Sequence, residues 1–197
     1  MKKLKVILIV LLMVLLIFLG KLGYDYLTGV YEEEGTKVSS GNNASIGGSI
    51  KEDKPLEKAK DFTVYDEDNN EVKLSDFIGK KNVVVNFWAS WCPPCKAEMP
   101  YFDEAMKTYK DEDVEILMVN LTDGMRETRE TAKDFIEEEG YDMDIVYDLD
   151  SDAAMTYYLN AVPRTLFIDI DGNVQYDHTG MITNSVLNNT IEKLLNK

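Results

Sequence analysis

The sequence predicts a mixed α/β domain in which a central β-sheet carries helices on both faces. The first observation is a pair of uninterrupted apolar runs, residues 83–88 and 114–119, which are typical of strands buried on both faces. The second is that segments with apolar residues at three- and four-residue spacing alternate with such runs. The third is a hairpin pattern near the end of the chain, followed by one more helical segment. This order of elements indicates a sheet covered by helices.

The folded domain is expected at residues 55–197 and opens with a β-hairpin. Residues 61–65 and 71–74 flank an acidic turn at residues 66–70, and a short helical turn is expected at residues 75–77. The buried strand at residues 83–88 follows. The next segment, residues 96–109, has the apolar spacing of a helix, and Pro100 within it predicts a kink.

The second half of the domain continues the alternation of strands and helices. The pattern predicts that Gly140 ends one helix and that Ser151 caps another. The expected elements are a strand at 114–119, a loop at 120–126, a helix at 127–139, a short strand at 145–147, a helix from Ser151 to about 159, hairpin strands at 165–168 and 174–178, and a last helix at 185–195.

The N-terminal segment has the pattern of a membrane anchor. Lys2, Lys3 and Lys5 precede an unbroken apolar run at residues 6–19, which is either the apolar part of a secretory signal or an anchor. No small-x-small cleavage pattern with Ala follows it, so we expect an uncleaved anchor at residues 1–28. The basic residues predict a cytoplasmic N-terminus and an extracytoplasmic domain at the cell membrane. Residues 29–54, rich in Gly, Ser and Asn, predict a flexible linker.

The charge of the chain excludes one class of partner. The formal net charge is −15, and the first thirty residues are basic, so the acidic excess lies in the remainder. An acidic body repels the phosphate backbone, which argues against a nucleic-acid partner.

The only two cysteines form the motif Cys92-Pro93-Pro94-Cys95 between a predicted strand and a predicted helix. The N-terminus of a helix stabilises a thiolate over a thiol, so this position favours a redox motif. A zinc site needs two more ligands of similar type, yet the chain has no third cysteine and His178 is its only histidine. A structural disulfide is weakened as an alternative because so short a loop adds little stability.

The motif suggests different roles for its two thiols and for their neighbours. Cys92, at the exposed end, is expected to attack client disulfides, and Cys95 to resolve the mixed disulfide. The prolines remove N–H donors near Cys92 and stiffen the ring. Other candidates have two readings each from the residues alone: Trp91 (docking surface or packing), Glu98 (proton acceptor for Cys95 or solvated glutamate), Val162-Pro163 (cis bond beside the cysteines or ordinary turn) and His178 (surface or satisfied histidine).

At residues 83–100 the sequence VVVNFWASWCPPCKAEMP resembles the active-site segment of the membrane-anchored TlpA/ResA-type thiol–disulfide oxidoreductases of the thioredoxin superfamily. The similarity runs from about Phe62 to the C-terminus. The resemblance implies a thioredoxin fold with an N-terminal β-hairpin and an inserted strand–helix pair at about residues 141–159. It also implies that Pro163 is cis and that Glu98 is the functional acidic residue.

Two positions depart from better-known relatives or from the family pattern. Asn86 stands where cytoplasmic thioredoxins carry a buried aspartate, which leaves Glu98 as the substitute proton acceptor. Arg164 follows Pro163 where the family usually has Thr, and a charged residue beside the expected docking surface of Trp91, Pro93, Pro94, Val162 and Pro163 suggests acidic partners.

The expected function is an extracytoplasmic enzyme that exchanges disulfides with client proteins through Cys92 and Cys95, as a reductant. We expect no cofactor beyond the redox-active disulfide and no metal. The expected partners are clients with thiols or disulfides, a membrane thiol protein that donates electrons, and the membrane itself; the resemblance suggests a role like that in cytochrome c maturation. Two alternatives stay open: a thiol peroxidase of the peroxiredoxin type and a non-enzymatic metal-binding or metal-delivery module.

Overall fold

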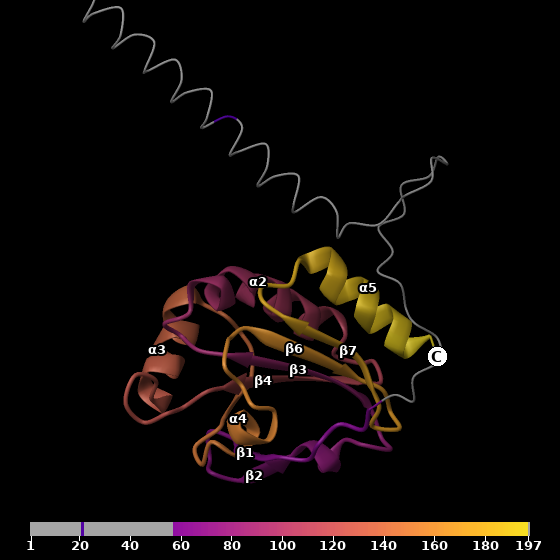
Figure 1. The fold of residues 1–197 in the computed structure, drawn as a ribbon, viewed down its shortest axis with the longest axis horizontal. Coiled ribbons are helices and arrows are strands. Elements are labelled where there is room, and N and C mark those ends of the chain that lie inside the picture. Colours follow the sequence, from indigo (N-terminus) through magenta and orange to yellow (C-terminus); the bar gives the residue numbers. More distant parts are fainter. Residues whose placement is uncertain (1–20, 22–56, 197) are drawn as a thin grey trace, which may run out of the picture. The chain divides into compact units, whose positions relative to one another are not determined.

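The computed structural model describes Lys21 and residues 57–196, and residues 57–196 form one seven-stranded sheet with its covering helices (Figure 1). The strand order is β2-β1-β5-β4-β3-β6-β7. The strands are β1 (Thr63–Tyr65), β2 (Glu71–Lys73), β3 (Asn82–Trp88), β4 (Val114–Asn120), β5 (Ile145–Tyr147), β6 (Arg164–Ile168) and β7 (Val174–Thr179). The helices are the 3₁₀ turn η1 (Leu74–Asp76), α2 (Pro93–Thr108), α3 (Arg129–Glu139), α4 (Asp152–Thr156) and α5 (Asn184–Leu195).

Parallel and antiparallel pairings divide the sheet. At its centre β3, β4 and β5 run parallel, as expected for strands joined by crossover helices. The flanking strands are antiparallel: β6 pairs with β3 and β7, while β1 pairs with β5 and β2. The carboxyl end of β3 therefore lies in the middle of the sheet, and the cysteine segment begins there.

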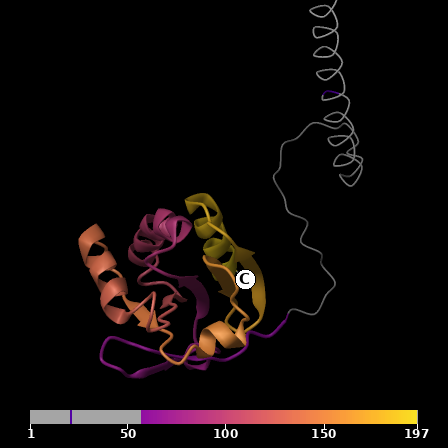
Figure 2. The same ribbon diagram turned by 60° about the vertical axis from the view of Figure 1, so that its left-hand side comes forward.

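Three helices cover one face of the sheet and one short helix covers the other. Helices α2, α3 and α5 lie together on one side, and α4 lies on the opposite side (Figures 1 and 2). Successive residues of β3 alternate between the two cores, since Val84 packs with the three helices and Val83 and Val85 pack in the second core. The prediction of helices on both faces is confirmed.

Several expected elements are confirmed with shifted ends. The N-terminal hairpin, the helical turn after it and the inserted pair β5–α4 are all present. Helix α2 begins at Pro93 rather than at residue 96, because Cys92 itself is the N-cap. Helix α3 begins at Arg129 rather than at residue 127, because the Thr128 side chain accepts a hydrogen bond from the Thr131 N–H and caps it.

Ser151 is the N-cap residue of α4, as predicted, but the predictions that its side chain caps the helix and that the helix reaches residue 159 are wrong. Helix α4 covers only Asp152–Thr156, and Ser151 has a positive φ of 56° and makes no capping hydrogen bond through its side chain. The buried carboxylate of Asp148 takes the capping role, since it accepts hydrogen bonds from the N–H groups of Ala153 (3.0 Å) and Ala154 (2.8 Å).

The predicted anchor at residues 1–28 and linker at residues 29–54 lie outside the described residues, Lys21 apart, and so does the predicted domain start at Pro55. Within the part of the chain that is described, no helix combines the length and the apolar character needed to cross a membrane.

Candidate active site

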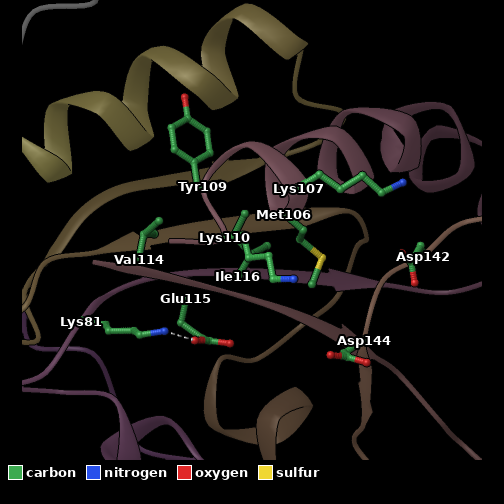
Figure 3. Close-up of a pocket in the computed structure, with 10 residues that line it drawn as sticks. All are labelled: Lys81, Met106, Lys107, Tyr109, Lys110, Val114, Glu115, Ile116, Asp142 and Asp144. Atoms are coloured by element: carbon green, nitrogen blue, oxygen red, sulfur yellow. Dashed lines mark hydrogen bonds and ion pairs between the residues drawn. The ribbon is translucent and has the colours of Figure 1, made fainter. Parts of the chain in front are cut away.

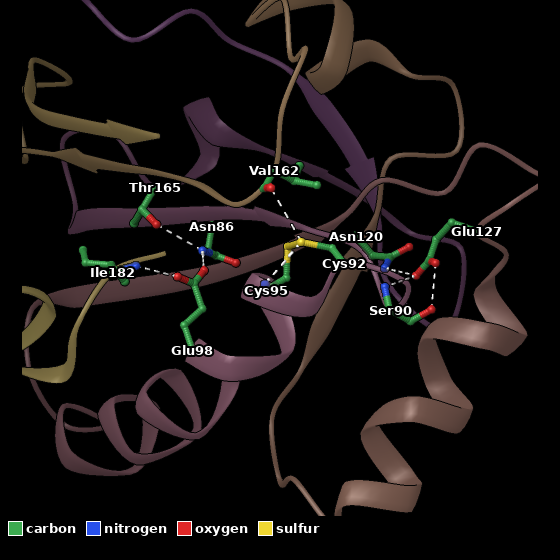
Figure 4. Close-up of a disulfide and its surroundings, with 10 residues drawn as sticks. All are labelled: Asn86, Ser90, Cys92, Cys95, Glu98, Asn120, Glu127, Val162, Thr165 and Ile182. Atoms are coloured by element: carbon green, nitrogen blue, oxygen red, sulfur yellow. Dashed lines mark hydrogen bonds between the residues drawn. A yellow bond between two sulfur atoms is a disulfide. The ribbon is translucent and has the colours of Figure 1, made fainter. Parts of the chain in front are cut away.

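The two cysteines form a disulfide at the start of α2 (Figure 4). Their Cα atoms are 5.3 Å apart, within the usual range for a disulfide. Cys92 Sγ accepts a hydrogen bond from the Cys95 N–H at 3.2 Å, so the sulfur occupies the N-cap position of the helix. A thiolate formed at Cys92 would receive the same N–H donor and the positive end of the helix dipole, which lowers its free energy relative to the thiol.

Access to the disulfide is narrow. Cys92 is 2% exposed and Cys95 is fully buried. Cys92 is thus the more exposed of the two cysteines, but it is far less accessible than predicted. The neighbouring side chains are the accessible ones: Trp91 is 39% exposed, and Pro93 and Pro94 are also exposed. A client must therefore meet these three residues before it reaches the sulfur.

The Val162–Pro163 segment lies beside Cys92. Its peptide bond is cis, and the Val162 carbonyl oxygen is 3.6 Å from Cys92 Sγ. In the oxidised protein this is a contact, since the disulfide sulfur has no proton to donate. After reduction the Cys92 thiol can donate to this carbonyl.

Glu98 is fully buried one helical turn beyond Cys95. Its Oε1 accepts a hydrogen bond from Asn86 Nδ2 at 2.8 Å, and its Oε2 accepts one from the Ile182 N–H at 2.7 Å (Figure 4). Asn86 Nδ2 also donates to Thr165 Oγ1 at 3.1 Å. Burial raises the pKa of the Glu98 carboxyl to about 7, against the lowering effect of these hydrogen bonds. Glu98 is therefore not a solvated glutamate, and near neutral pH it both accepts and releases a proton.

The position of Arg164 corrects the expectation drawn from sequence. Its guanidinium makes two hydrogen bonds with Asp177, at 2.9 and 2.7 Å, and donates to the Tyr157 carbonyl at 2.7 Å. Thr165 contacts Asn86 on the face that carries α2, and because side chains alternate along a strand, Arg164 points to the other face. Its charge is thus paired and directed away from the disulfide. His178, on β7, is bonded to Tyr176 Oη and the Met181 carbonyl.

Sequence reasoning missed Glu127. This carboxylate is fully buried and accepts hydrogen bonds from the Ser90 N–H (2.8 Å), Ser90 Oγ (2.8 Å) and Asn120 Nδ2 (2.7 Å). Figure 4 shows it beside the segment that leads into Cys92. It ties this segment to the loop before α3. No local pattern marks it, because its partners lie 7 and 37 residues away.

We expect Glu127→Ala to lower the free energy of unfolding by roughly 2–4 kcal/mol, because it leaves the buried Asn120 amide and the two partly buried donors of Ser90 without their acceptor. Denaturant titration of the oxidised protein measures this change. Glu138→Ala, an exposed change on α3, is the matched control and should alter stability by less than about 0.5 kcal/mol. Equal stability of the Glu127 and Glu138 variants would contradict the assigned role.

A pocket of about 320 Å³ lies at the other end of α2 (Figure 3). Its lining mixes basic and acidic side chains, with Lys81 and Glu115 forming an ion pair at 2.9 Å. Since Met106 lies 11 residues beyond Cys95 on α2, this pocket lies about 16–17 Å along the helix from the disulfide. Among the described residues, no group of three or more Cys, His, Asp or Glu side chains is arranged to hold a metal ion.

Comparisons with known proteins agree with this geometry. The AhpC/TSA family model matches residues 55–177. The chain is 33% identical to the thiol–disulfide oxidoreductase ResA of Geobacillus kaustophilus over 181 residues, 92% of each chain, and 30% identical to that of Bacillus subtilis over 174 residues, 88% of this chain and 86% of the relative. Its fold is similar to that of the exposed lipoprotein thioredoxin of Streptococcus pneumoniae, with a TM-score of 0.59, 28% identity and coverage of 68% of this chain and all of the other.

These relatives are described as thiol–disulfide oxidoreductases or as a thioredoxin, and the disulfide at the N-terminus of α2 suggests the same chemistry. The thioredoxin fold and the disulfide chemistry are both confirmed. The chain therefore belongs to the AhpC/TSA family and, within the thioredoxin superfamily, to the ResA-type thiol–disulfide oxidoreductases.

Proposed function

We propose that the chain is a membrane-tethered, extracytoplasmic reductant of disulfides in client proteins. The observation that carries the proposal is the Cys92–Cys95 disulfide, whose outer sulfur is the N-cap of α2 and whose accessible border is Trp91, Pro93 and Pro94. The Cys92 thiolate attacks a client disulfide, which forms a mixed disulfide and releases one client thiolate. The Cys95 thiolate then attacks Cys92 Sγ, which releases the second client thiolate and leaves the Cys92–Cys95 disulfide.

Glu98 serves this cycle as the proton acceptor for Cys95. With a pKa of about 7, its carboxylate takes the proton of the Cys95 thiol as that sulfur becomes the attacking thiolate. The buried hydrogen bonds from Asn86 and the Ile182 N–H hold the carboxylate in place. A membrane thiol protein then reduces the disulfide again and supplies two electrons.

The basic and apolar pattern at residues 1–28 supports the extracytoplasmic location, and so does the similarity to an exposed lipoprotein thioredoxin. We propose clients whose two cysteines are separated by two residues, as in the haem attachment motif of c-type cytochromes. A peroxidase of the peroxiredoxin type is less well supported, because its Pro-x-x-x-Thr-x-x-Cys context would need Pro and Thr where this chain has Val85 and Ala89.

Labelling of intact cells tests the location. In cells treated first with a permeant reductant, a membrane-impermeant maleimide should modify Cys92 of the full-length protein. A cytosolic protein with a reactive thiol is the matched control and should stay unmodified. Modification of Cys92 only after the cells are lysed would contradict the extracytoplasmic location.

A redox titration tests the direction of electron flow. We expect a reduction potential closer to the value of about −270 mV for thioredoxin than to about −120 mV for the oxidant DsbA. The oxidised fraction of Cys92–Cys95 after equilibration in glutathione or dithiothreitol buffers measures the potential. A value near that of DsbA would contradict the reductant role.

A further inference from the structure

The loop before α3 places a cation on the tryptophan that precedes Cys92. The Arg126 guanidinium carbon lies 3.7 Å from the centroid of the Trp91 ring, within the distance of a cation–π contact. Arg126 is exposed, Trp91 is 39% exposed, and the neighbouring Met125 is 88% exposed. Arg126, Trp91 and Met125 thus form an accessible surface, named here the Arg126 surface, beside the reactive sulfur.

The loop that carries Arg126 is held firmly. Asp123 Oδ1 accepts hydrogen bonds from the N–H groups of Met125 (2.8 Å), Arg126 (2.7 Å) and Glu127 (2.9 Å). The buried Glu127 then ties the loop to Ser90, one residue before Trp91. The backbone that carries Arg126 is therefore held close to the backbone that carries Trp91 before any client arrives, which reduces the entropy lost on binding.

Within the described residues the positive charge of Arg126 contacts the Trp91 ring and helps to lower the pKa of the Asp123 carboxyl, but it is not held in an ion pair. Among residues 57–196, no ion pair includes Arg126, in contrast to Arg164, which is paired with Asp177. Lys96, which follows Cys95 directly, is also without an ion pair in this part of the chain, and its Nζ lies 4.8 Å from the centroid of the Phe135 ring in α3. Two unpaired cations next to the motif are notable in a chain with a net charge of −15.

We propose that the Arg126 surface is a docking element that selects client segments carrying a carboxylate, from Asp or Glu, beside the reacting cysteine. This rests on the disulfide exchange proposed above and names the class of client. The acidic body repels an acidic segment over most of its surface, whereas the unpaired guanidinium at Cys92 attracts it. The apolar parts of Trp91 and Met125 contact the backbone and side chains of the same segment.

Two disulfide-linked peptides that differ only in Asp or Asn next to the cysteine test the proposal. The reduced full-length protein is mixed with each peptide, and the second-order rate constant is followed by chromatography of the peptide thiol. We expect the wild-type protein to reduce the Asp peptide about two- to five-fold faster, as for a single exposed ion pair, and the preference to fall at high ionic strength.

Arg126→Gln should bring the ratio of the two rate constants close to one. Arg126→Lys should retain part of the preference, because the charge remains. Lys110→Gln removes an exposed positive charge just beyond the C-terminal end of α2 and should keep the wild-type ratio. The ratio cancels any change in Cys92 reactivity, since such a change alters both rates equally.

Different outcomes separate the two proposals. An unchanged ratio in Arg126→Gln, or a wild-type ratio of one, would overturn the docking proposal and leave disulfide exchange standing. An equal loss of the preference in Lys110→Gln would also overturn it, because the net charge of the protein, and not the position of Arg126, would then cause the preference. Failure of the wild-type protein to reduce either peptide would overturn the exchange activity and the docking proposal together.

Discussion

Replacing Cys92 with alanine is expected to abolish disulfide reduction, whereas replacing Cys95 with alanine should leave the first attack intact and stop the cycle at the mixed disulfide. The difference arises because Cys92 keeps some exposed surface and receives the Cys95 N–H at its sulfur, while the Cys95 sulfur is fully buried. Without Cys92 no thiolate can reach a client. Without Cys95 no second thiolate can release the client already bound.

Two measurements check this pair of variants. Turnover of a disulfide-containing protein should be lost in both variants, and non-reducing electrophoresis should show a covalent adduct with the client only in Cys95→Ala. A Cys92→Ala/Cys95→Ala double variant is the control for non-specific adducts. Adducts that form through Cys95 when Cys92 is absent would reverse the assigned roles, and normal turnover in Cys92→Ala would exclude the mechanism.

Replacing Glu98 with glutamine is expected to remove a pH dependence of stability. Burial raises the pKa of Glu98 from 4.5 to about 7, so the folded state holds this proton more tightly than the unfolded state does. The stabilisation is fully present below pH 4.5 and is lost as the pH rises through 7. The shift of about 2.5 units corresponds to roughly 3 kcal/mol at 1.36 kcal/mol per unit.

Denaturant titrations of the oxidised protein between pH 4.5 and 8 measure this effect. The free energy of unfolding of the wild-type protein should fall over this range more steeply than that of Glu98→Gln. Because burial also raises the pKa of Asp148, the difference between the two proteins, and not the wild-type slope alone, reports on Glu98. Glu104→Gln, an exposed change on the same helix, should keep the wild-type slope. Parallel curves for wild type and Glu98→Gln would contradict the raised pKa.

The same substitution separates stability from chemistry. Glu98→Gln cannot accept the proton of Cys95, so the second step should slow near neutral pH even where the variant is more stable. The rate at which the mixed disulfide resolves, measured against pH, should lose the dependence that centres near pH 7 in the wild-type protein. An unchanged profile would remove Glu98 from the reaction and leave it a buried structural acid.

The sequence by itself determined the features that depend on neighbours along the chain. The apolar runs of β3 and β4 predicted buried strands, because a strand covered on both faces carries apolar residues at successive positions instead of alternating them with polar ones. The spacing of Cys92 and Cys95 at a strand-to-helix junction predicted the redox motif, and the absence of a third cysteine argued against zinc. The helix starts were misplaced by two or three residues because capping side chains set them.

Only the tertiary structure decided how the surroundings of the disulfide are built. Glu98 meets the Ile182 N–H across 84 residues, and Glu127 meets Ser90 across 37, so no local pattern could show either contact. Arg164 and Thr165 are adjacent, yet the alternation of β6 sends one to Asp177 and the other to the Glu98 network. The cation that lies beside the motif is therefore Arg126, on the ring of Trp91, and not Arg164. Side-chain direction and long-range packing decide this, and neither can be read from residues that are neighbours in the sequence.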